Sequence, residues 1–149
     1  MNIKLLSREE IVANWPYLQS QFQKAMDHGQ CESTTIDYLQ KLLNYQAQAW
    51  VIVSKDPIHD GFRGAGLTEI LNYNQHKTLH IILFTGDESA VNPEIIDVVE
   101  QFGKNNGCVA LEQWGRKGWA KMLPKQIPGF YEAYTVMRKD IDMLEKNNE

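Results

Sequence analysis

The amino-acid sequence predicts a single α/β (α+β) domain in which a mixed, mostly antiparallel central sheet is flanked by helices. Three observations support this fold class. In the first third of the chain apolar residues recur at three- and four-residue steps, and after residue 48 they fall in short extended runs. The second half then contains a strand, a helix and a returning strand, which is the order of a parallel crossover. With 149 residues, of which 43% are hydrophobic, the chain can build one core but hardly two.

The N-terminal part predicts a short strand followed by a helix. Residues 2–6 read as the strand, and Ser7 with Glu10 has the spacing of a capping box at the start of the helix. The apolar spacing from Arg8 to Met26 is that of one buried helical face. Because proline removes a backbone donor, we expect Pro16 to bend or interrupt this helix.

A second helix and a three-strand meander are expected next. The helix should begin near Thr35, with Thr34 or Thr35 as its cap. Its inward face is expected to hold Ile36, Leu39, Leu42, Leu43 and Ala47. The predicted strands are Ala49–Val53, Gly66–Tyr73 and Leu79–Thr85. The last of these is almost continuously apolar, which predicts a position inside the sheet.

The remaining elements complete the predicted order. Asn92 can cap a helix with Pro93 in its first turn, and this helix should end at Asn106–Gly107. The strand that returns after it should pair in parallel with the apolar strand of the meander. The predicted elements that follow the helix are a strand Cys108–Trp114, a short helix Gly115–Leu123 stopped by Pro124 and Pro128, and a last strand Phe130–Lys139. The domain is expected to span residues 1–144, with a loose tail over 145–149.

Composition excludes several classes of function. The chain carries 15 Lys+Arg against 19 Asp+Glu, a formal net charge of −4, which makes nucleic acid an unexpected partner. No run approaches the roughly 18 apolar residues that span a membrane, and MNIKLLSREE lacks a signal-peptide core, so a cytoplasmic location without a membrane partner is expected. Cys31 and Cys108 are far apart and form no CxxC pair, so neither a disulfide nor a metal site is expected.

The C-terminal segment carries a motif with a known counterpart. Ala120, Leu123, Gly129 and Phe130, followed by residues 137–139 (MRK), are similar to the closing pattern "A-x-x-L-Y-x-K-x-G-F" and basic-ended strand of the Gcn5-related N-acetyltransferase (GNAT) family. The order of the predicted elements resembles the same fold over nearly the whole chain.

A second motif narrows this resemblance. Residues 115–124 (GRKGWAKMLP) are similar to a segment of small GNAT-like proteins from tailed bacteriophages. That resemblance implies a protein of the host cytoplasm or of the virion.

In the GNAT family the loop after the central strand binds the diphosphate of coenzyme A (CoA) through glycine amides and a helix N-terminus. The matching segment here, residues 86–95 (GDESAVNPEI), has one glycine, the two acids Asp87 and Glu88, and Pro93. Two carboxylates repel a diphosphate and a proline offers no donor, which favours a degenerate acyl-CoA site. If the cofactor binds, the resemblance assigns its contacts to Thr85, Gly86, Val91 and Asn92.

The catalytic groups also depart from the family pattern. Pro124 stands where the family usually has a tyrosine that protonates the leaving thiolate, and Tyr131 or Tyr134 would have to replace it. A base that deprotonates the amine usually lies on the central strands. The candidates are Glu69, His80 and Glu112, whose sheet faces are unknown without a strand register.

A basic cluster lies on the predicted short helix. Lys117, Lys121 and Lys125 recur at four-residue steps, so they share one helix face. A tryptophan beside basic residues is a common composition at protein interfaces. The candidate residues for binding a protein partner or an anion are therefore Arg116, Lys117, Trp119 and Lys121.

Two functions remain open at this stage. The first is a phage-type GNAT-fold protein without a cofactor, retained for binding, for a place in the virion or for assembly, with a phage or host protein as its partner. The alternative is an active acetyl-CoA-dependent N-acetyltransferase acting on a small amine or a host protein. Self-association into a homo-oligomer is compatible with both.

Overall fold

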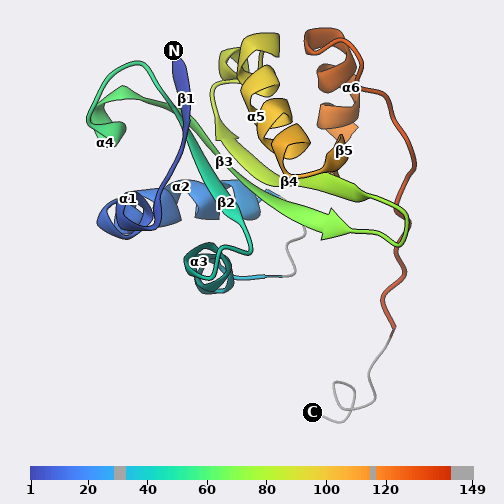
Figure 1. The fold of residues 1–149 in the computed structure, drawn as a ribbon, viewed down its shortest axis with the longest axis horizontal. Helices are drawn as coiled ribbons and strands as arrows, with labels where there is room; N and C mark the ends of the chain where they lie inside the picture. The colour runs from blue at the N-terminus through green and yellow to red at the C-terminus, as the bar shows by residue number, and fades with distance from the viewer. Residues whose placement is uncertain (29–32, 115–116, 142–149) are drawn as a thin grey trace.

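The computed structural model describes residues 1–28, 33–114 and 117–141 (Figure 1). Within these residues the chain forms one five-stranded sheet whose spatial order follows the sequence. Its strands are β1 (Asn2–Leu5), β2 (Gln48–Val53), β3 (Phe62–Asn72), β4 (Lys77–Gly86) and β5 (Cys108–Gln113). The neighbours from β1 to β4 are antiparallel, whereas β4 and β5 are parallel. The expected mixed, mostly antiparallel sheet is therefore present, and β4 has a neighbour on each side.

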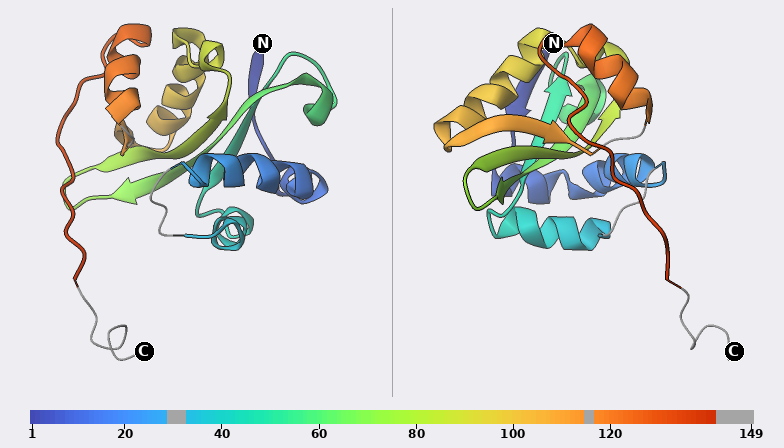
Figure 2. Two further views of the ribbon diagram at one scale, coloured as in Figure 1. Left: turned by 180° about the vertical axis from the view of Figure 1, so that it is seen from behind. Right: turned by 90° about the vertical axis from the view of Figure 1, so that its right-hand side faces the viewer.

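Helices cover both faces of this sheet, as the views in Figures 1 and 2 show. One face carries α1 (Arg8–Ala13), α2 (Trp15–Met26) and α3 (Thr35–Leu43), and the other carries α5 (Pro93–Asn105) and α6 (Lys117–Gln126). Two short elements lie in connections, namely α4 (Ile58–Gly61) and the 3-10 helix η1 (Glu88–Ala90). The molecule is thus a three-layer sandwich with the sheet in the middle.

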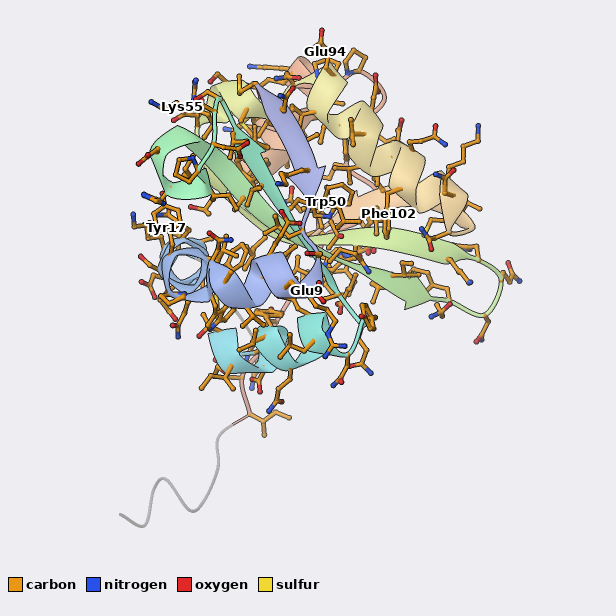
Figure 3. The ribbon with its side chains drawn as sticks, turned by 60° about the vertical axis from the view of Figure 1, so that its left-hand side comes forward. Glu9, Tyr17, Trp50, Lys55, Glu94 and Phe102 are labelled. Carbon is orange, nitrogen blue, oxygen red and sulfur yellow. The ribbon has the colours of Figure 1, made fainter. Side chains whose placement is uncertain are left out.

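Each sheet face has its own apolar core. Towards α1, α2 and α3, the side chains of Leu18, Phe22 and Leu42 are buried against those of the sheet. Towards α5, the rings of Trp50 and Phe102 meet edge to face with centroids 5.4 Å apart (Figure 3). Burial of these apolar groups holds the three layers together.

The predicted N-terminal helix signals are confirmed, but the predicted inward face of the second helix is partly wrong, since Ala47 lies beyond the end of α3 at Leu43. Ser7 and Glu10 form a capping box, and Thr34 forms another with its N3 residue at the start of α3. The predicted long helix is interrupted, with Pro16 in the first turn of α2. Ile36 does not face the core, because it is 60% exposed on α3. The buried face of α3 instead includes Tyr38, which belongs to the apolar core on this side of the sheet.

Two predictions for the C-terminal part are wrong. Pro124 does not stop the short helix, because α6 continues through it to Gln126 and Leu123 O still accepts the Ile127 N–H at 2.8 Å. Residues 130–139 do not form a strand, since this segment pairs with no described strand and most of its side chains are exposed. A strand needs both a hydrogen-bonded neighbour and a face to bury. The predicted tail over residues 145–149 lies outside the described residues.

Candidate functional site

The parallel strands β4 and β5 separate part-way along β4. Their pairing runs from Lys77–Cys108 to Ile81–Gln113, whereas β4 continues to Gly86. At the same point the pairing of β4 with β3 shifts register, so that Ile82 is an extra residue in β4. Such a bulge bends a strand locally. The sheet is therefore open between β4 and β5 beyond Ile81.

A groove of about 1030 Å³ lies at this open end. It is bordered by the end of β4, the loop before α5, the helix α6 and the C-terminal end of α2. Its charged and titratable lining residues are Lys24, His28, Glu88, Lys121 and Lys125. Three lysines against one carboxylate give the lining of the groove an excess of positive charge, which favours an anion. Lys24 of α2 and His28, two residues after the end of α2, were not predicted, because nothing in the sequence indicates that α2 ends beside α6.

The loop that leads into α5 uses several of its own amide donors. The N–H group of Asp87 donates to the Arg63 carbonyl oxygen. Those of Ala90 and Val91 donate to the carbonyl oxygens of Asp87 and Glu88 within the loop. The Asn92 side chain accepts the Ile95 N–H at 3.1 Å, and Pro93 has no N–H. Of the predicted cofactor residues, Thr85, Gly86 and Val91 line the groove, whereas Asn92 caps α5.

Gly86 is required at the end of β4 by a close approach of two strands. Its φ is +129°, and a Cβ at this position would lie 2.4 Å from the Arg63 carbonyl oxygen. The same crossing places Arg63 Nε 2.8 Å from Asp87 Oδ2. This ion pair engages one of the two carboxylates that the sequence places at the loop.

The three candidate bases lie in one row across the sheet. His80 on β4 is the register partner of Glu69 on β3 and of Glu112 on β5. Directly paired residues present their side chains on the same face. Lys41 of α3 binds Glu69 with an Nζ–Oε2 distance of 3.1 Å, which identifies this face as the one covered by α1, α2 and α3. The row lies one residue before the point where β4 and β5 separate.

His80 is the buried member of this row. Its side chain is among the buried polar groups of the core, with 7% of its surface exposed, and Nδ1 has no hydrogen-bond partner among the described residues. Burial lowers its pKa, and the opposing influence of Glu69 and Glu112 is smaller. The imidazole is therefore neutral at neutral pH and has a nitrogen that can accept a proton.

Glu112 is surrounded by aromatic donors. Its Oε1 accepts hydrogen bonds from Tyr73 Oη at 2.9 Å and from Trp114 Nε1 at 2.8 Å. The bond to Glu112 raises the pKa of Tyr73 to about 12. The pKa of Tyr134 is also raised, first by burial and then by Glu112. Both phenols therefore keep their protons at neutral pH.

The two predicted tyrosines are placed differently. Tyr134 interacts with the group at Glu112, whereas Tyr131 is 79% exposed and makes no polar contact with the other described residues. The contribution of Tyr73 was missed, because this residue follows β3 and only the tertiary structure brings its hydroxyl to Glu112 on β5, two strands away.

The predicted basic cluster is divided by the structure. Lys121 and Lys125 line the groove, and the ring of Trp119 packs edge to face on Phe84 with centroids 6.0 Å apart. Lys117 begins α6. Arg116 lies outside the described residues.

Comparisons with known proteins give the fold. No family model and no curated protein matches the sequence. Among solved structures, a probable acetyltransferase matches with a TM-score of 0.68 and 12% identity, over 96% of this chain and 98% of that one. A soil-metagenome aminoglycoside acetyltransferase in complex with sisomicin matches with a TM-score of 0.64 and 15% identity, over 95% and 96%.

A third similar structure is glucosamine-6-phosphate N-acetyltransferase from Arabidopsis thaliana, with a TM-score of 0.61 and 15% identity over 95% of this chain and 98% of that one. The chain therefore has an α+β fold of GNAT type. Nothing in these comparisons indicates a phage origin. None of the described helices has the length and apolar character needed to cross a membrane.

Proposed function

We propose that this protein is an acetyl-CoA-dependent N-acetyltransferase that acts on an amine. The observation that carries the proposal is the lysine-lined groove at the point where β4 and β5 separate. A groove of this volume is large enough for a cofactor. The fold is also that of solved acetyltransferases.

The residues around the groove fit the parts of coenzyme A. Lys24, Lys121 and Lys125 would bind its phosphates, replacing the loop amides that are used within the protein. The edge of β4 from Ile82 to Gly86 faces no paired residue of β5, so its backbone can hydrogen-bond the amides of the pantetheine arm. When bound, acetyl-CoA supplies a thioester carbonyl that the amine attacks as the thiolate leaves.

The row across the sheet supplies the groups for proton transfer. His80 or Glu112 would take the proton that the attacking amine loses, because both lie next to the opening of the sheet. Tyr134 would donate a proton to the leaving thiolate in place of the tyrosine that the family usually has where this chain has Pro124, since its phenol lies beside Glu112 and carries a proton at neutral pH. A cationic amine also complements the carboxylate of Glu112.

A binding protein with a degenerate acyl-CoA site is the second candidate. It is favoured by Glu88 in the groove, by Pro93 at the helix start and by Pro124. In that case Lys121 and Trp119 would contact a protein partner. A virion or assembly role depends on the resemblance of residues 115–124 alone.

Calorimetric titration with acetyl-CoA separates the two functions. We expect the wild type to bind, and Lys121→Glu with Lys125→Glu to weaken binding at least about tenfold, since each charge-assisted contact contributes about 1.5 kcal/mol or more. The charge-matched control is Lys55→Glu with Lys104→Glu, because both lysines are exposed and outside the groove. This control should bind like the wild type. No heat of binding at millimolar acetyl-CoA, or equal weakening in both double variants, would contradict the proposal.

A further inference from the structure

A second hollow lies between the sheet and the helices α5 and α6. This cavity has a volume of about 60 Å³. Most of its lining is aliphatic, including Ile52, Leu83, Ile96 and Leu123. It is on the face opposite to the row of Glu69, His80 and Glu112.

The cavity adjoins both the groove and the opening of the sheet. Phe84, Val91 and Trp119 line the cavity and the groove alike, so these side chains form the boundary between them. Ile81 of β4 and Gln113 of β5 form the last residue pair between these two strands, and both also line the cavity. The cavity therefore lies beside the groove and next to the opening of the sheet.

The chemistry of the lining favours a hydrocarbon. The polar side chains in the lining are those of Thr68 and Gln113. The Thr68 hydroxyl is already used, because it accepts a bond from Trp50 Nε1 at 2.9 Å and donates to Gln48 Oε1 at 2.8 Å. A buried water needs two to four polar partners, and an apolar cavity stays dry. An apolar cavity of about 150 Å³ accepts benzene, so one of this size fits a chain of about two to four carbons.

We propose that this cavity receives the acyl chain of the donor, and that the protein prefers an acyl-CoA longer than acetyl-CoA, with an optimum near butyryl-CoA. This inference rests on the proposed function and changes its preferred donor from acetyl-CoA to a longer acyl-CoA. It also assigns a specificity role to Gly66, which shares the face of its register partners Trp50 and Phe84. A Cβ on Gly66 would lie 3.8 Å from Phe84 Cδ2 and 3.3 Å from the Leu83 carbonyl oxygen, so a larger side chain would occupy the cavity.

Calorimetric titration with CoA, acetyl-CoA, butyryl-CoA and octanoyl-CoA tests the inference without any turnover. Each buried methylene contributes about fourfold in affinity, and butyryl-CoA has two more methylenes than acetyl-CoA, so it should bind about fifteenfold more tightly. Octanoyl-CoA should lose this gain, because its chain exceeds the cavity. Gly66→Val should abolish the preference for butyryl-CoA and leave the affinity for CoA unchanged.

A second variant covers the case in which Gly66→Val does not fold. Ile96→Val enlarges the cavity and should shift the preference from butyryl-CoA towards pentanoyl-CoA. The matched control is Ile58→Val, since Ile58 is equally buried but lies in α4, away from the cavity. Equal affinity for acetyl-CoA and butyryl-CoA, or the same shift in both Ile→Val variants, would overturn the inference while leaving the proposed function intact. Failure of CoA and all its esters to bind would instead count against the proposed function.

Discussion

Single residues of the same type have different roles here, because their partners differ. Asp87 and Glu88 are adjacent carboxylates, but Asp87 is paired with Arg63 at 2.8 Å whereas Glu88 lines the groove. The repulsion that the sequence predicts for a diphosphate is therefore reduced at one of the two acids. The three lysines of the groove outweigh the remaining one.

The buried His80 should make the stability of the protein depend on pH. Its folded pKa lies below the ordinary value near 6.5, so the unfolded chain binds the proton more readily. The stabilising contribution is then present above about pH 6.5 and is lost as the pH falls through the folded pKa. Urea denaturation measures the free energy of unfolding at each pH. Between about pH 7.5 and about pH 5.5 this free energy should fall less for His80→Gln than for the wild type.

The control for this pH effect is His59→Gln. The side chain of His59 is 61% exposed, so this variant should lose as much unfolding free energy as the wild type over the same pH range. An identical pH dependence of the wild type and His80→Gln would show that burial of His80 does not penalise its charged form.

At the level of elements, the ends of helices decide where the site residues lie. The capping box at Ser7 fixes the start of α1, and the break at Asn14 then directs α2 so that its end reaches the groove. Pro124 shows that a local helix-breaking residue does not always end a helix, because it lies inside α6. Its missing N–H costs α6 one hydrogen bond, and the packing of Leu123 and Ile127 in the core under α6 offsets this loss.

Removal of the α1 cap should destabilise the protein by a measurable amount. Ser7→Ala should lower the free energy of unfolding by about 1 kcal/mol, because the Ser7 hydroxyl accepts the Glu10 N–H at 3.2 Å. Ser20→Ala is the matched control, since Ser20 is exposed within α2 and alanine favours a helix. Chemical denaturation should show little change or a slight gain for the control. Equal effects of both substitutions would contradict a role for the cap.

For the whole molecule, stability depends on the contact between layers. Leu18 of α2 is fully buried against the sheet, whereas Leu5 of the edge strand β1 is 42% exposed. Leu18→Ala should therefore cost about 2–5 kcal/mol of unfolding free energy, through lost burial and the cavity that remains. Leu5→Ala should cost clearly less. Comparable losses in the two variants, measured by urea denaturation, would show that the layer contact is not the main stabilising feature.

Most of the element order could be predicted from local patterns. The capping boxes at Ser7 and Thr34, the Asn92–Pro93 helix start and the apolar strand that becomes β4 all involve neighbouring residues in the chain. The same kind of pattern failed for residues 130–139, whose alternating sequence finds neither a neighbouring strand nor a face to bury.

The sequence by itself determined the fold class, because helix caps, apolar periodicity and strand runs are short-range properties. Only the tertiary structure decided the site. Glu69, His80 and Glu112 form one row because of the strand register, and Lys24 joins Lys121 because two distant helices end at the same groove. Side-chain faces and groove linings depend on pairing between residues far apart in the chain, and that pairing is set by the packing of the whole domain.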